Sequence, residues 1–149
     1  MTGPVDQADN AADRDSIQLH KNHWLVTAED GRTVYTPADL DVSKHFNYVV
    51  FPRELLNSQS LREWFTFKLS SLQSQLGAAQ KKWTVKQEKD GSFSASNFYL
   101  NENGDKFAVG YNAVPTDKSA TSAFIVQMIA SNDMMLMLKY GMDFKHLIT

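Results

Sequence analysis

The stretch Ser60-Leu61-Arg62-Glu63-Trp64-Phe65 opens a helical pattern that ends at Gly77. Ser60 and Glu63 have the spacing of a capping box, in which each side chain accepts from the backbone N–H of the other residue. A glycine is a common C-terminal stop. We therefore predict a helix from Ser60 to Gly77, with an apolar stripe at helical spacing made of Leu61, Trp64, Phe65, Leu69, Leu72 and Leu76.

A second helical pattern follows a cap signal at Ser131-Asn132-Asp133 and runs to Ile148. The five consecutive large apolar residues from Met134 to Leu138 cannot all face one core from one helix. Two interpretations stay open for them: a helix end buried between sheet and loops, or an adaptable methionine-rich contact with another protein or a second copy. The main stripe consists of Met137, Tyr140, Gly141, Phe144 and Ile148, flanked by Met134, Leu138 and Met142.

Outside these helices the apolar spacing changes to two, which indicates strands. Three strands precede the first helix, and Asp30-Gly31 between the first two is a tight hairpin signal. A later strand, Ala123 to Ala130, is apolar on both faces, so we expect it to be covered on both sides. The early strands are expected at Trp24–Thr27, Thr33–Thr36 and Phe46–Phe51, the last ended by Pro52.

Asp90-Gly91 and Asn103-Gly104 predict two further hairpins with two-residue turns. Together these turns place Val85 opposite Ser96, and Ser96 opposite Tyr111. One face of the three strands is then apolar, which supports this register. The apolar face is expected to hold Trp83, Val85, Phe98, Leu100, Phe107, Val109 and Tyr111, and the polar face Thr84, Lys86, Glu88, Ala95, Asn97, Tyr99, Ala108, Gly110 and Asn112.

The elements follow one another in the order β-β-β-α-β-β-β-β-α. Hairpins combined with two amphipathic helices predict an α+β fold, a mainly antiparallel sheet of about six to seven strands with two main helices packed on it, one on each face. At 149 residues the chain has the size of one domain. We expect residues 17–149 to form that domain and residues 1–16, which carry four aspartates against one arginine, to form a disordered acidic leader.

This order, with the Trp24 strand near the start, the Leu/Trp helix in the middle and the hydrophobic terminal helix, resembles the Mog1/PsbP-like α/β/α sandwich over residues 23–148. The resemblance rests on element order, so it transfers no individual site residue. It implies a non-enzymatic binding protein, because that family includes photosystem subunits, small-GTPase binders, and bacterial envelope or secretion-associated chaperones and immunity-like proteins.

The composition argues against several classes of function. A net charge of −2 offers no basic field for nucleic acid. No run of about 18 apolar residues occurs, so we expect no membrane-spanning helix. No signal peptide is recognisable, which leaves the bacterial periplasm and the cytoplasm both open. Phosphate-binding glycine loops and cysteines are absent, and we expect no cofactor.

Histidines offer two weak signals for chemistry. His20 and His23 have a spacing that suits metal chelation on a helix, but they precede a strand, so no metal site is predicted. Asp143 and His146 have no nucleophile motif beside them, so no catalytic residue is predicted.

These observations favour a non-enzymatic domain that binds another protein, of the bacterial inhibitor, immunity or secretion-chaperone type. Small residues on the polar sheet face would let a partner approach the backbone closely, although an ordinary solvent-facing sheet is the alternative. A second hypothesis is an enzyme or small-ligand carrier with a pocket between sheet and helix, lined by Trp64, Tyr111 and Met128, and a third is a homodimer through the methionine-rich helix. The candidate partner-binding residues are Lys86, Asn97, Tyr99, Asn103, Asn112, Met135 and Leu136.

Overall fold

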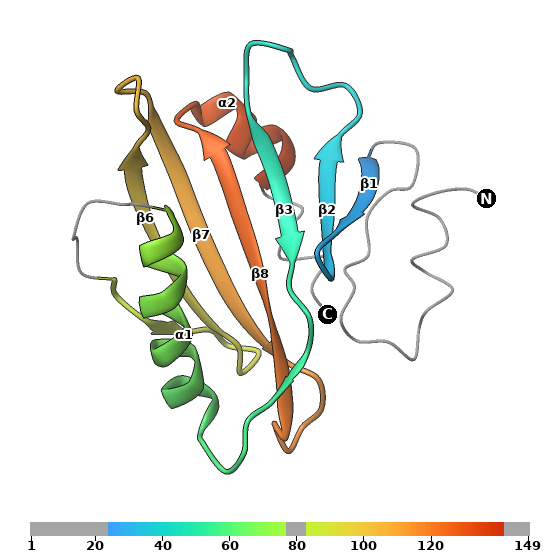
Figure 1. Cartoon of the computed structure of the whole chain (residues 1–149), viewed down its shortest axis with the longest axis vertical. Helices are drawn as coiled ribbons and strands as arrows, with labels where there is room; N and C mark the ends of the chain where they lie inside the picture. The colour runs from blue at the N-terminus through green and yellow to red at the C-terminus, as the bar shows by residue number, and fades with distance from the viewer. Residues whose placement is uncertain (1–23, 77–82, 142–149) are drawn as a thin grey trace.

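The chain folds into one eight-stranded antiparallel sheet with helices on both sides, as a computed structural model shows for residues 24–76 and 83–141 (Figure 1). The α+β fold class is therefore confirmed. The predicted leader 1–16 lies outside the described residues. The elements are β1 (Trp24–Glu29), β2 (Arg32–Pro37), β3 (Phe46–Val50), β4 (Glu54–Leu55), α1 (Leu61–Leu76), β5 (Lys86–Gln87), β6 (Phe93–Leu100), β7 (Lys106–Pro115), β8 (Ser122–Ser131), α2 (Met134–Leu136) and the π-helix η2 (Met137–Gly141).

The strands lie in the order β1-β2-β3-β8-β7-β6-β5, so the last strand in sequence is inserted in the middle of the sheet. The short strand β4 departs from the expectation that Pro52 ends the strand before it. Beyond β3 the chain stays beside β8: the Phe51 N–H donates to the Ile125 carbonyl at 2.9 Å, and Glu54 then pairs with Ala123. Pro52 therefore interrupts a strand that resumes two residues later.

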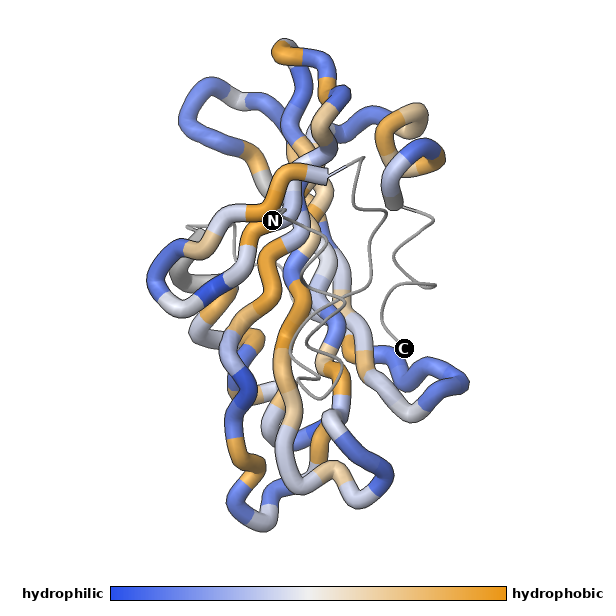
Figure 2. Tube along the Cα trace, turned by 90° about the vertical axis from the view of Figure 1, so that its right-hand side faces the viewer, coloured by the Kyte–Doolittle hydropathy of each residue, from blue (hydrophilic) through white to orange (hydrophobic). Residues whose placement is uncertain are grey.

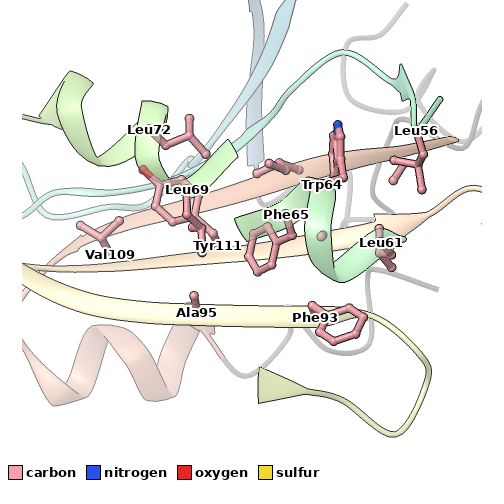
Figure 3. Close-up of a cluster of buried hydrophobic side chains, with 13 residues drawn as sticks. Leu56, Leu61, Trp64, Phe65, Leu69, Leu72, Phe93, Ala95, Val109 and Tyr111 are labelled. Atoms are coloured by element: carbon pink, nitrogen blue, oxygen red, sulfur yellow. The ribbon is translucent and has the colours of Figure 1, made fainter. Parts of the chain in front are cut away.

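Helix α1 covers one side of the sheet, which we call the helix face. The predicted capping box is confirmed, because the Ser60 N–H donates to Glu63 Oε1 at 3.0 Å and the Glu63 N–H donates to Ser60 Oγ at 3.1 Å. Figure 3 shows the apolar stripe of α1 packed on the strands. This first core contains Leu61, Trp64, Phe65, Leu69 and Leu72 from α1, together with Leu56, Phe93, Ala95, Val109, Tyr111, Ala113, Ala123 and Ile125.

The opposite face of the sheet carries a second core, rich in aromatic rings. Trp24 lies 5.5 Å from Tyr48 and 5.9 Å from Tyr140, measured between ring centroids. Leu136 and Tyr140 bring α2 and η2 onto this face, so the prediction of one helix on each face is confirmed. The core also contains Tyr35, Phe46, Val50, Phe124, Val126 and Ala130.

The methionine-rich segment is partly buried and partly exposed, as its pattern predicted. Leu136 is buried, whereas Met135 and Leu138 are exposed. The buried interpretation therefore holds for Leu136 and the exposed one for Met135. The remainder of the predicted helix, with Phe144 and Ile148, lies outside the described residues.

A polar cluster fixes η2 to the loop after β2. The Tyr140 hydroxyl donates to Asp39 Oδ1 at 2.7 Å, and Lys139 Nζ lies 3.1 Å from Asp39 Oδ2. From below, the buried Tyr48 hydroxyl donates to the Tyr140 carbonyl at 3.0 Å. The hydrogen bond from Tyr140, with the neighbouring Lys139 ammonium, lowers the pKa of the Asp39 carboxyl.

The two hairpins that contain β6 depart from the predicted register by one residue. Asp30-Gly31 is a two-residue turn, because Glu29 pairs directly with Arg32. At Asp90-Gly91 and Asn103-Gly104 the loops hold three residues, and each glycine adopts a left-handed φ, +90° and +84°. This geometry is a type I turn followed by a bulge residue, which glycine favours.

Side-chain hydrogen bonds from Asp90, within the first loop, and from Asn101, next to the second loop, stabilise the longer turns. Asp90 Oδ1 accepts from the Ser92 N–H at 2.9 Å. In the second loop, Asn101 Oδ1 accepts from the N–H groups of Asn103 and Asp105, both at 2.9 Å. Such Asx contacts stabilise turns by imitating backbone hydrogen bonds.

The two one-residue shifts cancel between β5 and β7. Only β6, the strand between them, therefore presents its side chains to the faces opposite to those predicted. Lys86 lies opposite Ser94, and Ser94 lies opposite Asn112. Val109 and Tyr111 therefore occupy the predicted apolar face, and Trp83 packs on Tyr111 with ring centroids 5.5 Å apart. The prediction was wrong for the side chains of β6. Phe98 and Leu100 point to the face opposite α1, and Ala95 packs under α1 in place of Phe98. The strand positions of Asn97 and Tyr99 belong to the helix face.

The two phenylalanines of α1 provide a test of the first core. Phe65 is fully buried, whereas Phe67 is 69% exposed. We expect Phe65→Ala to lower the free energy of unfolding by about 3–5 kcal/mol, because it removes a buried ring and leaves a cavity. Urea denaturation followed by circular dichroism would measure this loss. Phe67→Ala is the matched control and should stay within about 0.5 kcal/mol of the original protein; equal losses would contradict the placement of α1.

The Asp39 cluster predicts a dependence of stability on pH. A carboxyl whose pKa is lowered in the folded state stabilises the fold above its unfolded pKa, and this contribution is lost as the pH falls through the folded value. The original protein should therefore be more stable than Asp39→Asn at pH 7, and the difference should shrink below about pH 4. Urea denaturation of both proteins at several pH values would measure it. A difference that stayed constant down to pH 2 would show that the Asp39 carboxylate does not stabilise the fold.

Candidate functional site

The face opposite α1 is covered over only part of its width. The second core lies over β1, β2, β3 and β8, whereas β5, β6 and β7 carry exposed or half-buried side chains there. Within the described residues no helix packs on that part. We call this surface the open face, and its members are Lys86, Ser94, Ser96, Phe98, Leu100, Gly110 and Asn112.

Small side chains hollow the centre of the open face. A shallow depression of about 310 Å³ lies over β5, β6 and β7. Its floor includes Gly110, where an added Cβ would meet only the end of the Met128 side chain, at 3.9 Å. The depression is lined by Thr84, Lys86, Ser94, Ala95, Ser96, Gly110, Tyr111 and Asn112.

The two ends of the open face differ in character. Near β5, the Ser94 hydroxyl donates to Glu88 Oε2 at 2.5 Å, so this end is polar. At the other end Phe98 is 43% exposed and Leu100 is 63% exposed. Lys106 Nζ lies 4.5 Å from the centre of the Phe98 ring, a cation–π distance. The face therefore combines apolar, cationic and hydrogen-bonding groups, as protein interfaces do.

The structure brings together only some of the predicted binding residues. Lys86 and Asn112 share the open face, and Asn103 is exposed in the β6–β7 loop. The strand position of Tyr99 belongs to the helix face, and its side chain is outside the description. Asn97 alternates to the helix face as well, but its Oδ1 accepts from the Phe98 N–H at 2.8 Å.

The other two predicted residues, Met135 and Leu136, belong to α2 on the covered part of the sheet, and of these two Met135 is exposed and Leu136 is buried. Sequence reasoning missed Ser94, Ser96, Phe98 and Leu100 as members of the open face. The signal that would have found them is the pair of Asx residues, Asp90 and Asn101, which lengthen the turns.

A second cavity of about 260 Å³ lies on the helix face, between α1 and the β2–β3 side of the sheet. Phe51 and Trp64 form apolar walls, and Arg32 lies over the Phe51 ring at 4.5 Å. Lys68 and Glu54, at the rim, form an ion pair of 2.5 Å. The predicted pocket of Trp64, Tyr111 and Met128 does not form as one site: Trp64 lines this cavity, Tyr111 lines the open-face depression, and Met128 packs in the second core.

His45 is the one histidine within the residues that the structure describes. Its ring contacts Phe107 at 5.6 Å between centroids, and its Nε2 lies 3.3 Å from Asn47 Nδ2. Partial burial of the ring lowers the pKa of His45. Residues 24–76 and 83–141 contain no group of three or more side chains arranged to hold a metal ion. His20, His23, Asp143 and His146 lie outside the described residues.

No family model, no curated protein and no solved structure matches the chain. The resemblance to the Mog1/PsbP-like sandwich therefore stays a prediction from element order. In the part of the chain that the structure describes, no helix has the length and hydropathy to cross a membrane.

Two glycines test the backbone conformation of β7 and of the loop before it. Gly110 has no left-handed φ and has space for a Cβ, so Gly110→Ala should stabilise the protein by about 0.5–1 kcal/mol. Gly104→Ala is the matched comparison. Its φ of +84° strains any L side chain, so this change should cost about 1 kcal/mol. Thermal unfolding of both variants would measure the two changes in stability. Changes of the same sign would contradict the backbone conformation described for these glycines.

Proposed function

We propose that this chain is a non-enzymatic protein-binding domain and that the open face is its contact surface. The observation that carries the proposal is the uneven cover of one sheet face. Leu136 and Tyr140 cover the β1–β3 side, whereas Phe98 and Leu100 remain exposed on the β6 side. Figure 2 shows the strands largely in orange and white, with hydrophilic residues in many of the loops. Phe98 and Leu100 are exposed within a strand, and a partner that covered them would explain why these apolar side chains are there.

The shape of the open face supports contact with a macromolecule. Ser94, Ser96 and Gly110 keep the floor low, so a partner's backbone or side chains can approach the sheet closely. Lys86 and Asn112 supply hydrogen-bonding groups around that floor, and Phe98 supplies an aromatic anchor. An apolar anchor surrounded by polar groups is the usual composition of an interface.

The narrower classes predicted from the sequence, a bacterial inhibitor, an immunity protein or a secretion-associated chaperone, are specific forms of this proposal. Each of them works through protein–protein contact. A homodimer through α2 is a different form, supported by Met135, which is 71% exposed. Leu136 is buried, so a dimer contact on α2 would use Met135 and its exposed neighbours Met134 and Leu138.

A small-ligand carrier is the second candidate function, supported by the cavity between α1 and the sheet. Its volume of about 260 Å³ is slightly below the range of about 300–1,000 Å³ that is usual for ligand pockets. Trp64 and Phe51 provide apolar walls, and Arg32 and Lys68 provide cations at the rim. A small molecule that copurified with the protein and was released by Trp64→Ala would favour this function.

Site-specific photo-crosslinking tests the proposed contact surface. A photoreactive phenylalanine analogue at Lys86, on the open face, should form a covalent product with another protein in a lysate of the native host. The same analogue at Thr66, on the exposed side of α1, is the matched control. Mass spectrometry of the product would identify the partner. Products of equal yield at Lys86 and Thr66 would count against the open face.

A further inference from the structure

The cavity between α1 and the β2–β3 side of the sheet has walls from two separate parts of the chain. Trp64, Lys68 and Leu72 line it from α1, where a spacing of four residues places their side chains on one side of the helix. Phe51 and Pro52 line it from the segment between β3 and β4. Every residue that lines the cavity belongs to the described part of the chain, so these residues define its walls completely.

The interior of the cavity is apolar and rigidly packed. Trp64, Leu72 and Ile125 are at most 6% exposed and belong to the first core, against which Phe51 also packs. At one end the β1–β2 turn lies against Pro52, because a Cβ added at Gly31 would meet Pro52 Cγ at 3.6 Å. The apolar body of a ligand would therefore contact side chains that are already held in place.

The two cations of the cavity differ in what neutralises them. Lys68 Nζ forms its ion pair with Glu54. Arg32 is half-buried, and its Cζ lies 4.5 Å from the centre of the Phe51 ring, but it forms no ion pair with any described residue. Charged groups that lose water on burial are usually paired, so Arg32 is the cation that an anionic ligand would neutralise.

The carboxylates at the rim do not compete for Arg32. Glu54 is engaged by Lys68. Asp30 is exposed in the β1–β2 turn, and it is not within ion-pair distance of Arg32. A carboxylate that enters the cavity would therefore reach the Arg32 guanidinium without displacing a partner within the protein.

We propose that this cavity binds a small carboxylate with a flat apolar body. Arg32 binds the carboxylate, and Phe51 and Trp64 contact the body. A guanidinium that lies over a ring keeps N–H groups at its edge, and these match the two oxygens of a carboxylate. The volume of about 260 Å³ limits the body to about one ring. This inference rests on the second candidate function, the small-ligand carrier, and names its ligand class.

Binding of 3-phenylpropionate to the full chain labelled with 5-fluorotryptophan tests the proposal. The chain has three tryptophans, of which Trp64 lines this cavity and Trp24 lies in the second core. Fluorine NMR should show a saturable shift of the Trp64 resonance, with a dissociation constant of about 1 mM or lower, and no shift of the Trp24 resonance. The variant Trp64→Phe assigns the resonance.

Two related ligands test the charge. The uncharged 3-phenylpropionamide keeps the ring and the chain length, and it should bind at least about tenfold more weakly, because it loses the charge-assisted hydrogen bonds to Arg32. Free phenylalanine carries an additional ammonium close to that cation, so it should bind no better than 3-phenylpropionate. Both comparisons use the original protein and depend on no variant.

Substitutions of arginine test the residue. Arg32→Gln should weaken the binding of 3-phenylpropionate by about tenfold or more, and Arg32→Lys, which keeps the charge but loses the planar fork, should give an intermediate affinity. Arg62→Gln is the matched control and should leave the affinity unchanged. Arg62 also lies over a phenylalanine ring, 6.0 Å from the centre of Phe93, but it does not line the cavity.

Three outcomes would overturn the inference. Equal binding of the amide would show that the cavity takes neutral molecules, so the carrier function would stand and the carboxylate class would be rejected. Tighter binding of phenylalanine would assign the cavity to amino acids and give Asp30 a role. An unchanged Trp64 resonance at about 10 mM 3-phenylpropionate would reject the proposed ligand class, and the carrier function would then depend on a copurified molecule of another class. The crosslink at Lys86 tests the protein-binding function separately, because the open face lies on the other side of the sheet.

Discussion

The architecture depends on one strand, β8, that is buried on both sides. Ala123 and Ile125 belong to the core under α1, and Phe124 and Val126 belong to the core under α2 and η2. All four side chains are at most 3% exposed. A strand of this kind requires cover on both faces, so its alternation explains why the sheet has helices on opposite sides.

The sequence predicted the features that depend on many residues and missed one that depends on two. The α1 stripe and the double apolar character of β8 each rest on several positions, so a single local contact does not alter them. The loops at Asp90 and Asn101 are set by individual side-chain hydrogen bonds. An Asp-Gly pair forms a two-residue turn after Glu29 and part of a three-residue loop after Glu88, and the dipeptide alone does not distinguish them.

The same physical cause explains why only part of the candidate site was predicted. Because the two loop shifts cancel, the relation between β5 and β7 was correct, and Lys86 and Asn112 were placed together. The strand between them was inverted, so Asn97 and Tyr99 stood in the positions that Ser96 and Phe98 occupy. A one-residue error in pairing places every side chain of a strand on the opposite face of the sheet. The length of a hairpin loop is therefore the least reliable part of predicting which side chains lie on a surface.

The position of β8 in the sheet has a consequence for the order in which the molecule is built. Its neighbours β3 and β7 end at Val50 and Pro115, whereas β8 begins at Ser122. During synthesis the two halves of the sheet are therefore complete before the strand that joins them has emerged. Each half must wait with its inner edge unpaired, and such edges invite association with other nascent chains. The pairing of β3 with β8 joins segments that are distant in the sequence, and pairings of this kind slow folding.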